Sequence, residues 1–504
     1  MQFSVKLSKS SVYAEPMTEH EVHDLPVTRL AQLIAERKVS SRELLDLYAS
    51  RIEAMNPVVN AVITLDLDRA TAAASVADAE TAAGRSTGPL HGIPITVKDA
   101  LAVAGMRSTG GAIEHTDHVP ERDADVVAAV RAAGAIPFAK TNVPRWSGDI
   151  QTFNDIFGTS NNPWDTSLVP GGSSGGAATA VALGFTGFEL GTDIGGSIRI
   201  PAAYCGVVGH KPSFGLVPCG GYLDRVDYGT TEPDINVHGP LTRSVDDAEL
   251  LLDIIAGPPP DRAVAVRHEL TAARHRRIDE YRVAVWSSDA SCPSSIDTIA
   301  AVEGAADVLA SLGARLDREA RPEIDANAAS QLGGFLIASA TTPALGVEET
   351  EFFAALTSSP DTPADVAQLI SPYTTTHQSW LAADVTRAQI RRRWAAWFGE
   401  VDAVICPVIV TPPFPHVQTG TIIDRTITID GSERPYIDLL WWTMLIGMAY
   451  LPATVIPVGF TSGGLPLAVQ VVGPFMEDRT PLDVARAIRN ALGPITFPAA
   501  PITR

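Results

Sequence analysis

The chain has 504 residues, of which 45% are hydrophobic and 19% are charged. This composition is typical of a globular protein with a large core, and it excludes a chain that is mainly disordered, collagen-like or coiled coil. Acidic residues outnumber basic ones by 58 to 38, which gives a formal net charge of -20. Because nucleic-acid binding depends on basic surface, we expect no nucleic-acid partner.

The N-terminal part of the chain combines a polar start with helical patterns. Residues 1–24 lack the apolar stretch of a secretory signal, so we expect an N-terminal extension there. Ser40 and Glu43 form a capping box, which predicts the start of a helix. The expected elements are a helix around residues 30–34, the capped helix ending at Asn56-Pro57, a strand at 60–65 and an alanine-rich helix up to Gly84.

The middle and the end of the chain alternate between short apolar stretches and helical patterns. Strands are expected at 95–98, 135–139, 403–406, 453–458 and 467–472, and a helix at 123–133. Residues 260–395 contain one expected strand, at 282–286, within mostly helical sequence. Such alternation is typical of an α/β fold. We predict a single domain over residues 25–504, with a mostly helical insertion at about 260–395 that forms part of the substrate cavity.

An uncharged stretch at residues 439–460 is long enough to cross a membrane. Two prolines and a glycine interrupt its second half, and proline breaks a helix by removing a donor and clashing with the preceding turn. We therefore predict a buried helix up to Tyr450, then a buried strand, and no membrane span. The adjacent Trp441 and Trp442 should not both face the core, because successive helix positions point in different directions.

Four widely spaced cysteines indicate a reducing compartment. They form no C-x-x-C pair, so the sequence predicts neither a zinc site nor a disulfide framework. The expected location is the cytoplasm. The acidic and histidine-containing stretch at residues 114–118 lies in a predicted loop without ligand spacing, and we expect it to be solvated. The prediction is therefore no metal and no cofactor.

Two glycine-serine blocks, at residues 171–176 and 191–197, carry the chemistry of the sequence. Glycine-rich loops can bind phosphate, but a P-loop ends in Gly-Lys-Ser/Thr and Gly176 is followed by Ala177. Residues 171–175 also match the G-x-S-x-G elbow of α/β-hydrolases, with Ser173 as the nucleophile. That elbow needs a strand directly before the serine, where this sequence has a loop, and a catalytic histidine that the sequence does not single out.

A serine activated by a lysine is the third interpretation of these blocks. A serine hydroxyl needs a base to take its proton, and a lysine can be that base where burial lowers its pKa. The chain has only six lysines, and Lys98 directly follows the apolar stretch at 93–97. For Lys140 and Lys211 we expect structural pairing with the backbone.

The order of these motifs resembles the amidase signature family. The resemblance rests on Gly-Ile-Pro-Ile-Thr-Val-Lys-Asp at 92–99, Lys-Thr-Asn at 140–142, Asn-Pro-Trp at 162–164, both glycine-serine blocks, Pro-Ala-Ala-Tyr-Cys-Gly at 201–206, His-Lys-Pro at 210–212 and Leu-Pro-Ala at 451–453. It covers about residues 25–260 and 400–495. The family includes aryl acylamidases, urethanases, fatty acid amide hydrolase and the amidase-type component of the glutamyl-tRNA amidotransferase. It implies a central twisted mixed β-sheet surrounded by helices.

The resemblance also implies a Ser-cisSer-Lys triad. By position, Lys98 corresponds to the general base, Ser173 to the bridging serine and Ser197 to the nucleophile that carries the acyl group. The oxyanion hole corresponds to the backbone N–H groups of Ile194, Gly195, Gly196 and Ser197. Supporting hydrogen bonds are implied for Ser174, Asp193 and Arg199, and a place in the lining of the acyl pocket for Ser147 and Gly148.

These implications predict an amidase that hydrolyses the carbon–nitrogen bond of a small, apolar or aromatic amide through an acyl-enzyme, with water as the second substrate. Carbamates, as in a urethanase, and esters are further candidate substrates. Two alternatives stay open: an A-type component of a glutamyl-tRNA amidotransferase, which works with partner chains and tRNA, and a catalytically inactive binding protein of the same fold. The sequence leaves the oligomeric state open, with a homodimer as one option.

Overall fold

The computed structural model describes residues 22–223, 229, 231–342, 345–363, 366–367 and 370–503. The predicted N-terminal extension at 1–24 therefore lies outside the described residues up to residue 21. At its end, Val22 and His23 are already buried in the packed structure. Within the described residues, no helix combines the length and the apolar character that a membrane span requires.

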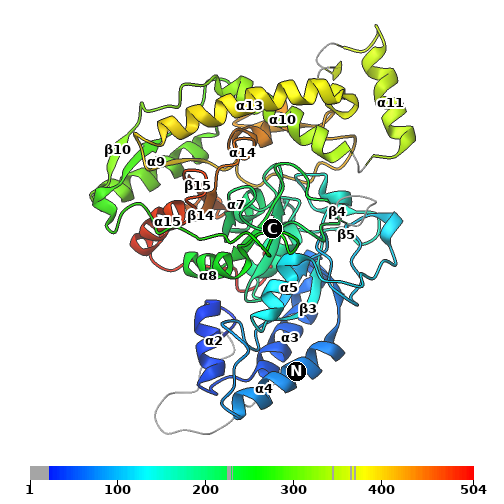
Figure 1. The fold of residues 1–504 in the computed structure, drawn as a ribbon, viewed down its shortest axis with the longest axis vertical. Helices are drawn as coiled ribbons and strands as arrows, with labels where there is room; N and C mark the ends of the chain where they lie inside the picture. Colours follow the sequence, from blue (N-terminus) through cyan, green and yellow to red (C-terminus); the bar gives the residue numbers. More distant parts are fainter. Residues whose placement is uncertain are drawn as a thin grey trace.

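Helices and a small sheet form the N-terminal end of the molecule, drawn in blue in Figure 1. Helix α3 (Ser41–Val59) begins with the predicted capping box, in which Ser40 and Glu43 satisfy each other's backbone N–H groups. It continues through Pro57 to Val59, so the expected end at Asn56-Pro57 is wrong. Pro57 lies in the last helical turn, where one missing donor is tolerated. The other elements here are α2 (Val27–Ala35), α4 (Leu67–Ala82), α5 (Asp125–Ala132) and a sheet of β1 (Val62–Leu65), β3 (Ile136–Thr141) and β2 (Pro94–Lys98).

An eight-stranded mixed sheet forms the centre of the fold and confirms the predicted α/β class. Its strands, in spatial order, are β10 (Arg315–Asp317), β9 (Arg282–Val285), β11 (Ala403–Pro407), β15 (Pro466–Val472), β14 (Ala453–Phe460), β7 (Val208–Lys211), β8 (Val237–Thr242) and β6 (Glu189–Asp193). The first three run parallel, and the other neighbours are antiparallel. Residues 260–395 thus contribute two strands instead of the one expected, because three-residue β10 is too short to show a periodic pattern.

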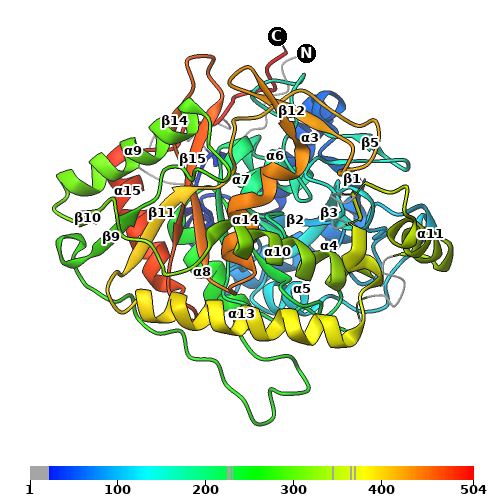
Figure 2. The ribbon, with the colours of Figure 1, turned by 90° about the horizontal axis from the view of Figure 1, so that it is seen from above.

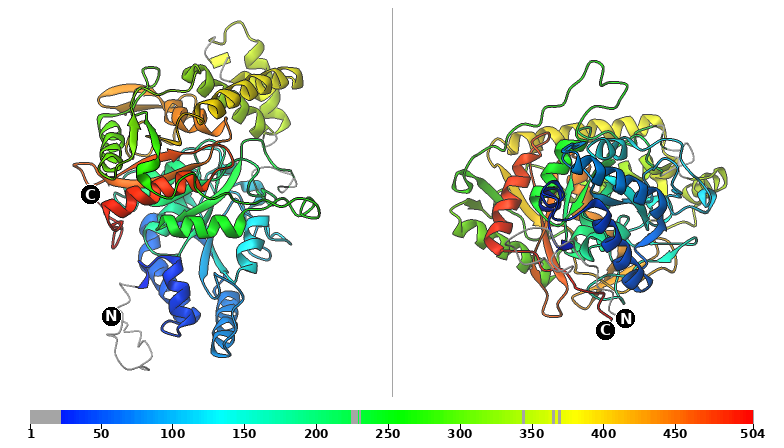
Figure 3. Two further views of the ribbon diagram at one scale, coloured as in Figure 1. Left: turned by 60° about the vertical axis from the view of Figure 1, so that its left-hand side comes forward. Right: turned by 90° about the horizontal axis from the view of Figure 1, so that it is seen from below.

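Helices cover both faces of this sheet. Side chains of a strand alternate between the two faces, and in β11 Ile405 packs into one apolar cluster while Val404 and Cys406 pack into the other. Helices α8 (Val245–Ile255), α9 (Ile296–Ser311) and α15 (Arg479–Leu492) lie on the first face; Figure 3 shows α15 in red beside α8 in green. Helices α6 (Gly175–Ala182) and α7 (Arg199–Cys205) lie on the second.

A further helical layer lies outside α6 and α7 (Figures 1 and 2). It contains α10 (Ala326–Thr341), α11 (Val347–Ser358), α13 (His377–Trp397) and α14 (Trp441–Gly447), with the small hairpins β4 (Phe153–Asn154) to β5 (Gly158–Thr159) and β12 (Thr426–Ile429) to β13 (Ser432–Pro435) nearby. Helix α14 ends before the predicted Tyr450. Trp441 and Trp442 are both buried, contrary to expectation, because α14 is enclosed on all sides.

Candidate active site

Ser197 lies in the short loop between β6 and α7, on the wall of a cavity of about 710 Å³. The residue is only 8% exposed. The carboxylate of Asp193 holds the loop by accepting hydrogen bonds from the N–H groups of Gly196 (2.9 Å) and Ile198 (3.1 Å). Gly196 has a φ of +123°, and a Cβ there would lie 2.8 Å from the Ile200 side chain. The loop conformation therefore requires glycine at this position.

The same contacts narrow the predicted oxyanion hole. The N–H group of Gly196 already donates to Asp193, which removes it from the four predicted donors. Ile194, Gly195 and Ser197 line the cavity and leave their N–H groups as the candidates. Preorganised N–H groups beside a reacting carbonyl stabilise the negative charge that develops on its oxygen.

A buried ion pair supports this loop. Arg199 donates to both carboxylate oxygens of Asp193, with Nη2–Oδ1 at 2.8 Å and Nε–Oδ2 at 3.0 Å, and neither side chain is exposed. Burial acts to raise the pKa of Asp193, but the charge and hydrogen bonds of Arg199 outweigh it and hold the pKa below its usual value. Arg199 also donates to the Thr443 carbonyl (3.1 Å), and Thr443 Oγ1 donates to the Gly195 carbonyl (2.7 Å). The pair thereby ties the Ser197 loop to α14.

Replacement of Arg199 by alanine should destabilise the fold strongly, because it leaves the Asp193 carboxylate buried without its cation. Breaking a buried pair in this way costs about 3–5 kcal/mol. The matched control is Arg42→Ala, which removes an exposed pair with Asp46 on α3 and should cost about 0.3–0.5 kcal/mol. Urea unfolding of both variants measures the difference. Equal, small losses in the two variants would contradict the supporting role of Arg199.

Lys98 and Ser173 meet beneath the loop. Lys98 ends β2, Ser173 directly precedes α6, and Lys98 Nζ lies 2.8 Å from Ser173 Oγ and 2.7 Å from Thr192 Oγ1. Both members of the pair are fully buried. The peptide bond between Gly172 and Ser173 is cis. The structure thus brings together two residues that the sequence separates by 75 positions.

Burial lowers the pKa of Lys98 to about 7, although the charges of Asp193 and Glu189 act to raise it. Asp99, its neighbour in the sequence, is not among the causes, and its carboxylate instead accepts hydrogen bonds from Thr109 (3.0 and 2.5 Å). Since an ordinary lysine titrates near 10.4, Lys98 carries a far larger neutral fraction at neutral pH. A neutral amine at this distance can accept the proton of the Ser173 hydroxyl.

The two glycine-serine blocks lie against each other. The backbone N–H of Ser174 donates to the Ser197 carbonyl at 3.2 Å. The Ser174 hydroxyl has no hydrogen-bond partner in the part of the chain that the structure describes. Support from Ser174 therefore comes through its backbone, and it keeps Ser173 next to the segment that carries Ser197.

Two other lysines show that burial alone does not identify a base. Burial lowers the pKa of Lys140 to about 8 and that of Lys211 to about 7. Lys140 donates to the Leu101 carbonyl and to Ser108 Oγ, and Lys211 donates to the Pro212 carbonyl (2.8 Å). The predicted structural pairing with the backbone is confirmed. Lys98 differs from both because its amine contacts a serine beside the Ser197 loop.

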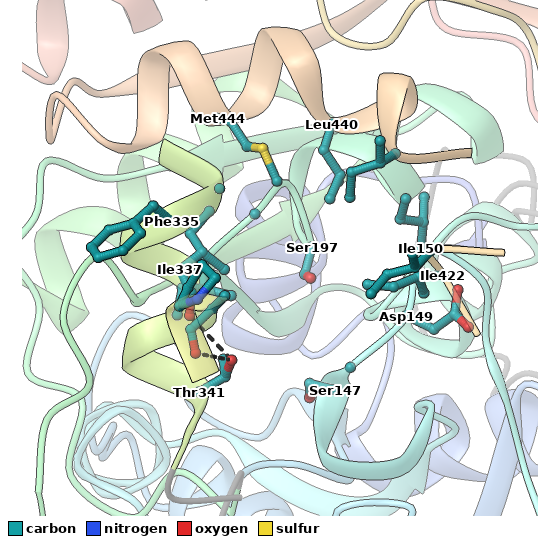
Figure 4. A pocket seen from close by; sticks show the side chains of 18 of the residues that line it. Ser147, Asp149, Ile150, Ser197, Phe335, Ile337, Thr341, Ile422, Leu440 and Met444 are labelled. Carbon is teal, nitrogen blue, oxygen red and sulfur yellow. Dashed lines mark hydrogen bonds between the residues drawn. The ribbon is translucent and has the colours of Figure 1, made fainter. Parts of the chain in front are cut away.

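The cavity in front of Ser197 has mainly apolar walls (Figure 4). They come from the loop after β3, from the Ser197 loop, from α10 and from the segment before and within α14. The apolar side chains labelled in Figure 4 are Ile150, Phe335, Ile337, Ile422, Leu440 and Met444. Ser147 and Gly148 line the same cavity, as the resemblance implied.

Three charged residues also line the cavity, and each one is already paired. Arg145 contacts Glu114 at 2.6 Å. Asp149 contacts Arg425 at 2.6 Å and accepts a hydrogen bond from the Tyr436 hydroxyl at 2.9 Å. Asp438 contacts Arg434 at 2.9 Å. An unpaired charge on a bound ligand would therefore have to compete with these pairs.

Sequence reasoning missed most of the cavity wall. Of the apolar residues in the insertion, it singled out Phe335, which lines the cavity, but also Trp394 and Trp397, which are buried in the core. The available signal was the three- and four-residue spacing along α10 that puts its cavity-lining residues on one face. The stretch at 114–118 is not fully solvated, because His115 packs edge-on against Trp146 at 4.8 Å. Among the described residues, no group of three potential ligands could hold a metal ion.

Comparison with known proteins identifies the family. The model of the amidase family matches residues 43–482. The chain belongs to the amidase signature family. It is 32% identical, over 504 residues, to the amidase-type component of the glutamyl-tRNA(Gln) amidotransferase of Synechococcus sp. (strain CC9605), a match that covers 93% of this chain and 96% of the relative.

Solved structures of the family have the same fold. The structure of an amidase is 29% identical and superposes with a TM-score of 0.75 over 93% of this chain and 100% of that chain. A bacterial aryl acylamidase of the amidase signature family superposes with a TM-score of 0.77 at 24% identity, over 94% of this chain and 97% of that one. This chain is accordingly an amidase, an enzyme that acts on the carbon–nitrogen bond of amides.

Proposed function

We propose that this amidase hydrolyses a neutral, largely apolar amide through an acyl-enzyme on Ser197. The observation that carries the proposal is the cavity of about 710 Å³ at Ser197, whose walls are mainly apolar and whose charged side chains are already paired. Binding a charged substrate group there would require desolvation without a free partner, which is costly. A neutral acyl or amine group meets no such penalty. Carbamates and esters of similar shape fit the same argument.

The proposed mechanism uses the Lys98, Ser173 and Ser197 chain in both directions. Ser197 Oγ attacks the carbonyl carbon while its proton passes to Ser173, whose own proton passes to neutral Lys98. N–H groups of Ile194, Gly195 and Ser197 bind the oxyanion. The proton then returns by the same path to the leaving amine, the carbon–nitrogen bond breaks, and an ester on Ser197 remains. Water, activated by the same path, hydrolyses the ester and restores Ser197.

A second candidate function is that of the amidase-type component of a glutamyl-tRNA(Gln) amidotransferase. It is supported by the 32% identity, over nearly the whole of both chains, to that component of the Synechococcus enzyme. In that case the chain would work with partner chains and tRNA, and the expectation of no nucleic-acid partner would not hold. The substrate amide would then be glutamine, whose ammonium and carboxylate groups need partners that the cavity wall does not leave free.

Purified chain alone distinguishes the two functions. We expect it to hydrolyse a neutral aryl or alkyl amide, and to do so with a kcat/KM at least tenfold above that for glutamine, because no charged group of the described cavity wall is free to hold glutamine. Chromatography of the released amine and an ammonia assay measure the two reactions. Glutamine hydrolysis without activity on any apolar amide would overturn the proposal in favour of the amidotransferase. Failure of Ser197 to react with a fluorophosphonate would instead favour an inactive binding protein.

We also propose that residues 25–504 form one domain in which the insertion at about 260–395 belongs to the substrate cavity. The support is that α10, which lies in this insertion, supplies a wall of the cavity. The cytoplasm is the proposed location, since all four cysteines, Cys205, Cys219, Cys292 and Cys406, are unpaired buried thiols.

A further inference from the structure

One face of α10 forms a wall of the substrate cavity. The residues of this helix that line the cavity recur every three or four positions, as one face of an α-helix requires. They are Asn327, Ser330, Gln331, Gly334, Phe335, Ile337, Ala338 and Thr341. The other side of the cavity at this level is Met444 of α14. At the centre of this face the helix therefore carries no side chain at all, at Gly334.

Two consecutive glycines in the middle of a helix need an explanation, because glycine is among the weakest helix formers. For Gly333 the explanation is packing. It is buried where α10 crosses α14, and a Cβ there would lie 3.0 Å from the Met444 carbonyl oxygen and 3.2 Å from its carbonyl carbon. Backbone atoms cannot give way easily, so only glycine lets the two helices approach this closely.

Packing does not explain Gly334. A Cβ on Gly334 would meet only the flexible end of Met444, with Sδ at 3.5 Å and Cε at 3.6 Å, which is ordinary van der Waals contact. Apart from the backbone of its own helix and its chain neighbours, no other atom of the described residues lies within 4 Å of that position. Its φ is not in the left-handed region either. A side chain at 334 would therefore fit the fold and occupy cavity space.

We propose that Gly334 is a specificity-determining residue, which keeps the cavity wide beside Met444 so that a bulky apolar group of the substrate can bind there. The proposal rests on the proposed hydrolysis of an apolar amide and adds the size of the group that the enzyme accepts. Met444 fits this role because an unbranched thioether adapts its shape to different apolar partners. Substrates with a small group need neither the space nor the Met444 contact.

The test compares Gly334→Leu with the unmodified enzyme on two sets of amides. One set varies the acyl group from acetyl to a branched or aryl acyl group, and the other varies the amine in the same way. We expect kcat/KM for the bulky member of at least one set to fall on the order of 10–200-fold, the scale on which a hydrophobic pocket discriminates volume, while kcat/KM for the acetyl, small-amine substrate stays within about threefold. Gly334→Ala should give the same preference to a smaller degree.

Gly333→Ala is the matched control. It should lower the melting temperature, because its Cβ meets backbone atoms of α14, whereas Gly334→Ala should keep or raise it because alanine is the better helix former. An unchanged preference for substrate size in Gly334→Leu, in a folded enzyme that reacts normally with a small fluorophosphonate, would overturn the proposal. Loss of the fluorophosphonate reaction in the unmodified enzyme would instead reject the proposed Ser197 chemistry, so the two failures are distinguishable.

Discussion

Replacement of Ser197 by alanine should lower kcat/KM for amide hydrolysis on the order of 10⁶-fold, the scale seen when a serine hydrolase loses its nucleophile. The reason is positional. In the described structure, Ser197 combines a hydroxyl on the cavity wall with the backbone N–H groups of its own loop. Steady-state kinetics and labelling with a fluorophosphonate measure the loss. The fold should survive, because the loop is held by Asp193 and Arg199 and not by the Ser197 hydroxyl.

Ser173→Ala is the informative comparison for this prediction. It removes the hydroxyl between Lys98 and the cavity but keeps the nucleophile, so it should label slowly, still at Ser197, and hydrolyse poorly. Peptide mapping of the labelled protein identifies the modified residue. If Ser197→Ala labelled normally and Ser173→Ala did not, Ser173 would be the nucleophile, and the G-x-S-x-G interpretation of residues 171–175 would return.

Lys98→Ala should lower kcat/KM on the order of 10²–10⁴-fold, the usual scale for the loss of a general base, and should change its pH dependence. Only the neutral amine can take a proton. Because burial lowers the pKa of Lys98 to about 7, kcat/KM of the unmodified enzyme should be low in acid, rise with pH through an ionisation near that value and level off above it. The variant should lack this ionisation. A pH–rate profile of both proteins on one activated amide measures it.

Lys140→Ala is the control for the pH profile. Lys140 is also buried and also has a lowered pKa, about 8, but its amine binds the Leu101 carbonyl and Ser108 away from the serine pair. Its loss should reduce stability and leave the ionisation of Lys98 in place. A profile of the unmodified enzyme that is flat from about pH 6 to pH 10, or an ionisation that persists in Lys98→Ala, would show that Lys98 is not the base.

Local patterns predicted most elements well, and they failed where the deciding contact was not local. The capping box at Ser40 and Glu43 and the strand ending at Lys98 were recognisable because a few adjacent residues determine them. The three-residue strand β10 was missed because its partner, β9, lies far earlier in the chain. The burial of both Trp441 and Trp442 was missed because it depends on how α10 and Trp286 enclose α14.

Two different kinds of information thus identify this enzyme. The order and spacing of short motifs determined its family and named Lys98, Ser173 and Ser197, since the residue types that can do this chemistry are few. Only the tertiary structure decided that Lys98 and Ser173 lie 2.8 Å apart, that the Gly196 N–H is used by Asp193, and that α10 walls an apolar cavity. The physical reason is that a pKa, a hydrogen bond between distant segments and the volume of a cavity all arise from burial, which depends on every element packed around the site.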